Sequence, residues 1–142
     1  MLLQCICASF LCESWLGIHA LTTDTLKMAL YGSSANLGPD TTAYTTTGEI
    51  TGTGYTAGGV ALTSVVVGLT GGVTYLDAAN IEWPVATFIA RAGLLYNASK
   101  ANRALAVLDF GAEKSSLGNT FRVVLPPPNS EKAFMRLTTY RG

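Results

Sequence analysis

Short runs of β-branched and aromatic residues, separated by turn residues, recur along the chain from Thr25 onward. Within several of these runs apolar and polar residues alternate, which is the period of a half-buried β-strand. No long stretch after residue 20 has the spacing of an amphipathic helix. This pattern predicts an all-β fold, an antiparallel β-sandwich of jelly-roll or immunoglobulin-like kind, over residues 21–142.

The expected strands are short and are separated by segments rich in Gly, Asn, Ser and Pro. A Thr70-Gly71-Gly72 turn joins two of them into a hairpin, and three consecutive prolines at 126–128 end another. The expected strands are 25–31, 60–69, 73–77 with a continuation through 81–83, 86–97, 104–111, 121–125 and 132–140.

Residues 1–20 are expected to form an N-terminal helical arm. Their opening is apolar, but it lacks the basic start of a signal peptide, and about a dozen apolar residues are too few to span a bilayer. Leu11, Trp15 and Ile18 share one face at helical spacing. We therefore expect an amphipathic helix that ends near Gly17.

All three cysteines, Cys5, Cys7 and Cys12, lie in this arm, so no disulfide framework holds the body of the chain. Their spacing does not match a zinc site, because a tetrahedral site needs further ligands and only His19 is near. We expect the thiols to pack as small apolar side chains, and we expect no bound metal.

A stretch rich in Thr and Gly, residues 41–63, carries the spacing Gly-x-Gly-x-x-x-Gly-Gly over residues 52–59. A phosphate-binding glycine loop needs a helix directly after it, because the free amides at the helix N-terminus hold the anion. Here the residues that follow are β-branched, and no Gly-Lys-Ser/Thr is present. The stretch is expected to be a surface-shaping loop, with one short strand at most, anchored by Tyr44, Ile50 and Tyr55.

The ionisable residues predict no catalytic constellation and no cofactor. His19 is the only histidine, and the acidic residues are scattered rather than paired for acid–base work. One carboxylate is unusual, because Asp109 lies between apolar neighbours in a strand and has to be exposed or paired. Its candidate partners are Arg91, Arg103 and Arg122.

The charge balance favours a component of an assembly. Nine basic and nine acidic residues cancel, so no basic surface for a nucleic-acid backbone is indicated. Charged residues are 13% of the chain and apolar residues 49%, so much of the surface must be neutral. A soluble monomer normally keeps its net charge away from zero. Direct binding to nucleic acid or to a membrane is not expected.

The aromatic residues leave a carbohydrate-binding adhesin module open as an alternative, since sugars stack on exposed rings. Aromatic residues in strands are more often part of a core or of a subunit interface. The rings in question are Trp83, Tyr44, Tyr55, Tyr75 and Tyr96.

The segments MALY, TTAYTTTGEI, GTGYTAGG and VLDFG occur together in this chain. Their combination resembles a group of small structural proteins encoded in the virion gene blocks of tailed bacteriophages. The resemblance covers roughly residues 18–137. It implies a small all-β virion protein, and several proteins of this kind decorate or cement capsids.

On this resemblance, the expected function is that of a capsid cement or decoration protein on the outer capsid surface of the virion. Such a protein bridges and stabilises subunits of the major capsid protein, and we expect it to self-associate as a dimer or trimer. A tail, neck or fibre-base component of the same virion is the first alternative. The expected contact residues belong to the arm and to the Thr/Gly stretch and are Leu11, Trp15, Ile18, Tyr44, Ile50 and Tyr55.

Overall fold

The computed structural model describes residues 1–124 and 135–138 and contains one short helix and eight strands in that part of the chain. The predicted all-β class is confirmed, with antiparallel sheets throughout. The elements are β1 (Cys5–Ile6), α1 (Ala8–Trp15), β2 (Leu26–Tyr31), β3 (Val60–Ala61), β4 (Val66–Thr70), β5 (Val73–Asp77), β6 (Ile81–Asn97), β7 (Arg103–Val123) and β8 (Met135–Thr138).

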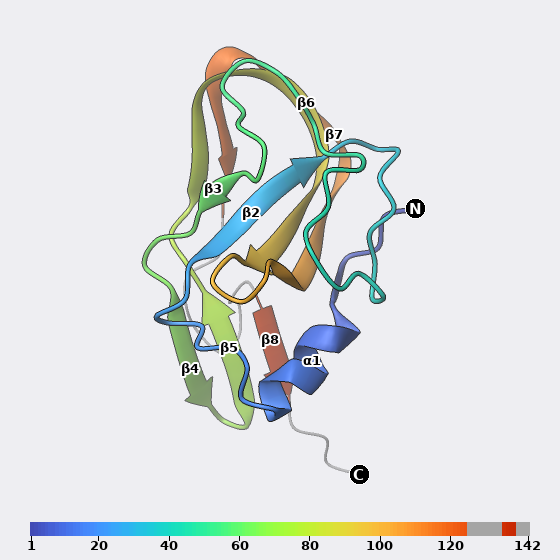
Figure 1. Ribbon diagram of the computed structural model, residues 1–142. Coiled ribbons are helices and arrows are strands. Elements are labelled where there is room, and N and C mark those ends of the chain that lie inside the picture. The colour runs from blue at the N-terminus through green and yellow to red at the C-terminus, as the bar shows by residue number, and fades with distance from the viewer. Residues whose placement is uncertain (125–134, 139–142) are drawn as a thin grey trace.

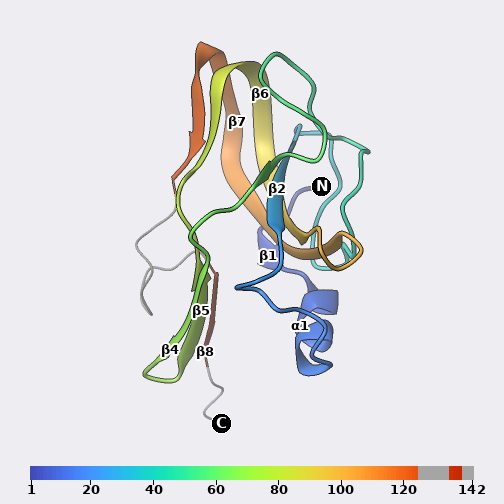
Figure 2. The same cartoon turned by 60° about the vertical axis from the view of Figure 1, so that its left-hand side comes forward.

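The strands form two sheets. The larger has the order β1-β7-β6-β2-β3, and the smaller has the order β4-β5-β8. Figure 1 shows the larger sheet in the upper part of the molecule, with β4, β5 and β8 below it and α1 beside them. After a turn of the view, α1 and the smaller sheet lie on opposite sides of the lower part (Figure 2).

β6 and β7 form a long two-stranded ribbon within the larger sheet. The ribbon bends over at its upper end (Figures 1 and 2). The register of the pair shifts between Trp83 and Ala86, where Val85 has a φ of 49°. On β7, Gly118 has a φ of 72°, which glycine adopts at little cost. The bend brings Phe88 and Phe121 together, with ring centroids 5.0 Å apart, and part of the core lies inside it.

Because of the bend, two of the expected strands are parts of one strand. Residues 104–111 and 121–125 were expected as separate strands, but 103–123 form the single strand β7, because positive-φ glycines turn the backbone without ending the ladder. Residues 81–83 begin β6 rather than continuing β5. Leu125 and most of the expected last strand, 132–134 and 139–140, lie outside the described residues.

Other expected strands agree with the structure after small changes in their bounds. The hairpin about Gly71 and Gly72 is present as β4 and β5, but β4 begins at Val66. Val60 and Ala61 pair instead with β2. β2 itself is buried at five of its six residues, because β6 and β3 flank it and side chains pack on both of its faces.

The helix of the arm is shorter than residues 1–20 and ends where the sequence predicts. Gly17 has a φ of 71°, and the amides of Gly17 and Ile18 donate hydrogen bonds to the carbonyls of Ser14 and Glu13. This is the Schellman arrangement, which caps the last carbonyls of a helix. Before the helix, β1 joins the edge of the larger sheet by pairing with β7.

Candidate interaction surfaces

A single carboxylate, that of Glu49, organises the Thr/Gly stretch. The hydroxyl groups of Tyr44 and Tyr55 donate hydrogen bonds to its two oxygens over 2.5 and 2.6 Å. The amide of Gly58 donates a third bond over 2.7 Å. Charge-assisted bonds of this kind are stronger than neutral ones. Three points of a segment with little regular structure are therefore held on one side chain.

The tyrosines of this cluster are half-buried or buried, and their titration reflects it. Burial, together with the neighbouring Glu49 carboxylate, raises the pKa of Tyr44 to about 12. The same causes raise the pKa of Tyr55 further. The ring of Tyr44 stacks on that of Tyr96 with centroids 4.9 Å apart, and the Tyr96 hydroxyl donates to the carbonyl of Gly58 over 2.6 Å.

The expected contact residues of the Thr/Gly stretch therefore face the chain's own core. Tyr44, Ile50 and Tyr55 are partly buried and pack against the core. The ring of Tyr55 lies edge-on to Phe88, and its hydroxyl accepts a hydrogen bond from the amide of Leu30. Their observed role is to fix the shape of the loop.

Close backbone contact completes this attachment. Gly59 has a φ of 76°, and a Cβ atom at this position would overlap the backbone carbonyl of Met28 on β2. Gly52 and Gly54 lie in the same way against the backbone around Thr87 and Val85 of β6. The glycines that do not form a phosphate loop thus allow the stretch to lie directly on two strands.

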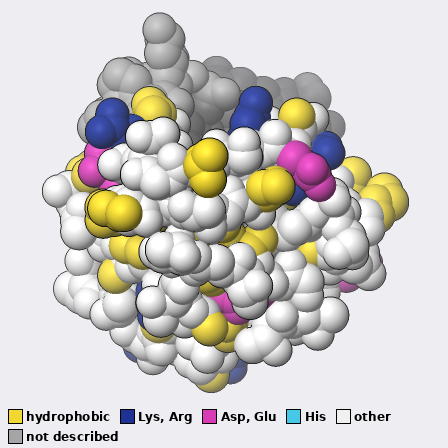
Figure 3. All heavy atoms as spheres, turned by 90° about the horizontal axis from the view of Figure 1, so that it is seen from above, with side chains coloured by type: hydrophobic (Ala, Val, Ile, Leu, Met, Phe, Trp, Pro, Cys, Tyr) yellow, Lys and Arg dark blue, Asp and Glu magenta, His cyan; other side chains and the backbone are white. Residues whose placement is uncertain are grey.

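Where the loop meets the bend of the ribbon, apolar side chains are exposed. Val85, Ile89 and Leu117 point into solvent, and Leu117 is 80% exposed. We call these three residues and loop residues 51–54 the apical surface. Seen from above, apolar side chains are scattered over this end of the molecule and most charged ones lie toward its edge (Figure 3).

A cleft of about 780 Å³ runs between the loop and the ribbon beside the apical surface. Its walls are small hydroxyl side chains and aliphatic ones, with Glu49 between them. Since the oxygens of Glu49 already accept three hydrogen bonds, the cleft offers shape and apolar contact rather than a free carboxylate. The lining includes Ser34, Glu49, Thr51, Phe88, Ile89 and Leu117.

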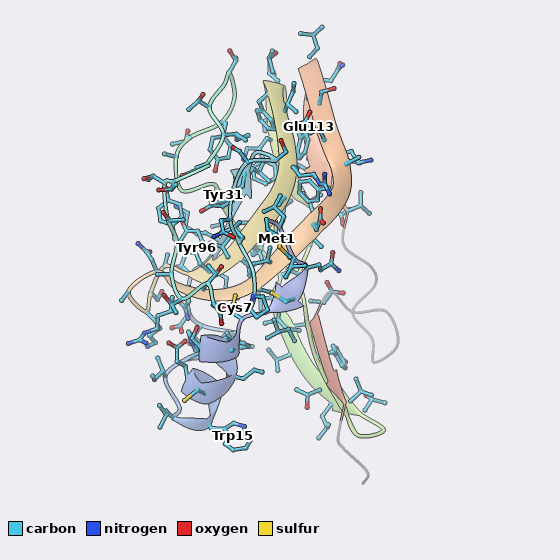
Figure 4. The ribbon with its side chains drawn as sticks, turned by 90° about the vertical axis from the view of Figure 1, so that its right-hand side faces the viewer. Met1, Cys7, Trp15, Tyr31, Tyr96 and Glu113 are labelled. Carbon is cyan, nitrogen blue, oxygen red and sulfur yellow. The ribbon has the colours of Figure 1, made fainter. Side chains whose placement is uncertain are left out.

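The helix α1 departs from the usual polarity of a surface helix, because it buries its one carboxylate and exposes several apolar side chains. Its buried residues are Phe10 and Glu13, whereas Trp15 is 94% exposed. Leu11 and Cys12 are exposed on the same side, as is Leu16 just after the helix. In Figure 4, Trp15 lies at the lower end of the helix. Ile18, predicted to share the face of Leu11 and Trp15, lies beyond the helix and is half-buried.

Polar contacts explain why Glu13 faces inward. One carboxylate oxygen accepts a bond from Arg103 over 2.6 Å, and the other lies 3.0 Å from Nε2 of His19. Burial alone would raise the pKa of Glu13, but the hydrogen bonds from His19 and Arg103 outweigh burial and lower it. The one carboxylate of the helix thus links it to Arg103 at the start of β7.

His19 continues this network. The amide oxygen of Asn97 accepts from Ser99, so its Nδ2 group faces Nδ1 of His19 at 3.0 Å. Nδ1 must accept this bond, and the ring then carries its proton on Nε2, toward Glu13. Nδ2 of Asn97 also donates to Asp24 over 2.8 Å. The side chain of the histidine is buried, and both of its ring nitrogens are hydrogen-bonded.

The predicted pairing of Asp109 is confirmed, and its partner is Arg91, with Nε 2.9 Å from Oδ1. The hydrogen bond from Arg91, with a second from the amide of Gly111, lowers the pKa of Asp109. The other two candidate arginines have other partners, since Arg103 pairs with Glu13 and Arg122 with Glu82.

The three cysteines are free thiols in different surroundings. Cys7 is buried, and burial raises its pKa to about 12. Cys5 is partly buried, and burial raises its pKa as well. Cys12 is exposed on α1. Packing therefore describes Cys7 and Cys5 but not Cys12. No group of three or more potential metal ligands occurs among residues 1–124 and 135–138.

The aromatic rings considered for sugar binding do not form an exposed platform. Trp83 and Tyr96 are each 2% exposed. Tyr44 and Tyr55 are partly buried, with hydroxyls bonded to Glu49, and Tyr75 on β5 is half-buried.

Comparisons with known proteins identify no relative of this chain. No family model matches the chain, and neither a curated protein nor a solved structure is significantly similar to it.

Within the described residues, the helix is too short to cross a membrane.

Sequence reasoning missed the residues most exposed at the apical surface. Val85 and Leu117 were not singled out, because each lies in a stretch without clear alternation, beside a shift in the register of β6 and β7. Glu49 was grouped with the scattered carboxylates. Its position between Tyr44 and Tyr55, five and six residues away, was the available signal.

Proposed function

We propose that this chain is a non-enzymatic structural subunit of a tailed-bacteriophage virion, most specifically a decoration protein that binds the outer surface of the capsid. The proposal is supported by the sequence resemblance of residues 18–137 and by the apical surface. A narrower fold assignment, to a jelly-roll or immunoglobulin-like sandwich, stays a prediction.

The observation that carries the proposal is the combination of rigidity and apolar exposure at the apical surface. Val85, Ile89 and Leu117 are exposed there beside a loop that Glu49 holds in place. Burying one aliphatic side chain of this size against a partner contributes about 1–2 kcal/mol. A preformed surface also avoids the cost of ordering a loop on binding. These features suit docking on another protein.

Repetition converts a modest contact into a large effect on a shell. A subunit that binds only the assembled shell stabilises it by mass action, and each copy adds its share. We assign the shell contact to the apical surface rather than to the side chains of Tyr44, Ile50 and Tyr55, which hold the loop. The partner on this proposal is the major capsid protein.

The copy number per particle tests the location. Mass spectrometry of purified particles, calibrated with labelled peptides of this chain and of the major shell protein, gives the ratio directly. One copy per shell subunit, or a simple fraction, supports a decoration protein. About six to eighteen copies per particle would move the chain to the tail or neck, where rings of low symmetry are built. Absence from particles would refute the virion role.

A binding assay tests the surface. The purified chain is added to shells that lack it, and bound protein is measured after sedimentation. We expect Leu117→Ser to weaken binding by about tenfold, because it removes an exposed apolar anchor. Leu69→Ser is the matched control, since Leu69 on β4 is 71% exposed but lies outside the apical surface. Equal binding of both variants would exclude this surface as the contact.

A further inference from the structure

We propose that the outer face of α1 (Leu11, Cys12, Trp15 and Leu16) docks against the same face of a second copy of this chain. The inference concerns the end of the molecule that carries the arm, and it does not depend on the virion role. It rests on three properties of the described residues: the polarity of the helix, the area of its exposed face and the absence of charge on that face.

The polarity of the helix has a cost in free energy, because it places a carboxylate in a buried position. A helix on the surface of a monomer normally buries its apolar stripe and exposes its charges. Here Glu13 is buried and held by Arg103 and His19, while Trp15 is 94% exposed. Burying a carboxylate requires partners that replace its water. Two partners are present, so the outward position of Trp15 is built into the packing of the arm.

The exposed side chains form one contiguous patch. Leu11 and Trp15, and Cys12 and Leu16, are neighbours because residues four apart adjoin on a helix. The patch presents on the order of 400 Å² of apolar surface, which is in the range of functional patches rather than scattered residues. A stable interface needs about 800 Å² per partner. The patch is about half of that area and therefore suits a weak dimer.

The lack of charge on this face favours a second copy as its occupant. No exposed residue from Ala8 to Leu16 is ionised. The one acidic residue of this segment, Glu13, is buried and paired with Arg103, and the segment contains no basic residue. A charged partner surface would lose hydration against this face and gain no counter-charge. A lipid surface would normally be met by Lys or Arg on the helix, and α1 has neither. A second copy offers an equally neutral face without like-charge repulsion.

Two-fold symmetry makes the contact specific enough to test. In an isologous contact the same patch is used by both copies, so residue i meets residue j and j meets i, and residues near the two-fold axis meet their own counterparts. Trp15 then packs near Leu11 or Leu16 of the second copy, and the two Cys12 thiols come close to each other. Cys12 is the one exposed cysteine of the three.

Sedimentation equilibrium of the full chain over a range of concentrations tests the dimer. We expect a monomer–dimer equilibrium, and we expect both Trp15→Ser and Leu16→Ser to weaken it by about tenfold or more. Leu69→Ser is the matched control, because Leu69 and Leu16 are 71% and 70% exposed. A chain that stays monomeric up to about 100 µM, a range that covers weak interfaces, would overturn the proposal. Equal effects of Leu16→Ser and Leu69→Ser would do so too.

Cross-linking locates the contact and does not depend on how strongly a variant dimerises. A short bismaleimide, which joins two thiols, is added to the wild type, to Leu69→Ser and to Cys12→Ser. The expected product is a covalent dimer in the first two and none in Cys12→Ser. A dimer that still forms in Cys12→Ser, or no covalent dimer in a sample that sediments as a dimer, would place the interface elsewhere and refute the α1 contact.

Discussion

Glu13 on α1 and Arg103 at the start of β7 are ninety positions apart in the chain and lie 2.6 Å apart in the structure, measured from Oε2 to Nη1. This contact fixes which side of the helix faces the sheet. Because the carboxylate is satisfied inside, Leu11 and Trp15 are left outside. This ion pair, together with the burial of Phe10, holds the apolar face of Leu11 and Trp15 toward solvent.

Removing the carboxylate is expected to destabilise the chain. Glu13→Ala leaves the Arg103 and His19 donors without their acceptor, which costs about 1–3 kcal/mol. Urea unfolding measures the loss in free energy of unfolding. The control is Glu113→Ala, because Glu113 is exposed and accepts its hydrogen bond from the exposed hydroxyl of Ser33; its effect stays within about 0.5 kcal/mol. A similar loss for both variants would contradict the structural role of Glu13.

The same pair predicts a dependence on pH. The pKa of Glu13 is lowered in the folded chain, so its ionised form favours folding. The stabilisation is therefore present above the ordinary glutamate value of about 4.3 and is lost as the pH falls through the lowered value. The gap in stability between wild type and Glu13→Gln should narrow steadily below about pH 4. A gap that is constant from pH 7 to pH 3 would exclude this linkage.

The sequence predicted the fold class because alternation and turn residues are local signals. The Gly71-Gly72 hairpin and the strand up to Tyr31 followed from them. The bend of β6 and β7 did not, since Gly111 and Gly118 signal a turn in sequence but here lie at irregularities of a strand that pairs with β6 on either side of them. Whether a glycine ends a strand or bends it depends on the partner strand, which is not a local property.

The candidate surfaces were predictable only in part. Helical spacing grouped Leu11 with Trp15, but it could not tell which face of the helix is buried, because that depends on Arg103 across the fold. The loop anchors Tyr44 and Tyr55 were found as large residues in a small-residue stretch. Their inward direction comes from Glu49 and the core.

The Glu49 cluster predicts a loss of stability at alkaline pH. The pKa of Tyr44 is raised to about 12 by burial and by Glu49. The neutral phenol therefore stabilises the fold fully below the ordinary value of about 10, and this contribution is lost as the pH rises toward 12. Unfolding followed by circular dichroism from pH 8 to pH 12 should show the decline, and Tyr44→Phe should reduce it. If stability falls just as much in Tyr44→Phe, other groups cause the loss of stability at alkaline pH.

Replacing Glu49 itself should loosen the Thr/Gly stretch. Glu49→Ala leaves the hydroxyls of Tyr44 and Tyr55 and the amide of Gly58 without their acceptor. We expect a loss of about 2–3 kcal/mol and faster proteolysis within residues 51–57, measured by mass spectrometry of the fragments. Glu113→Ala serves again as the exposed control. Cleavage of both variants at the wild-type rate would show that the loop is held by other contacts.

Alanine substitutions at Gly59 and Gly71 distinguish the effect of backbone strain from that of steric overlap. Both have a positive φ, of 76° and 58°, so alanine costs about 1–2 kcal/mol at each through the backbone. At Gly71 a Cβ atom meets nothing within 4 Å, whereas at Gly59 it overlaps the Met28 carbonyl. Gly59→Ala must therefore also move the loop off β2, and we expect a total loss of more than about 4 kcal/mol. Urea unfolding of the two variants measures the difference, and equal losses would mean that the loop does not lie directly on the backbone of β2.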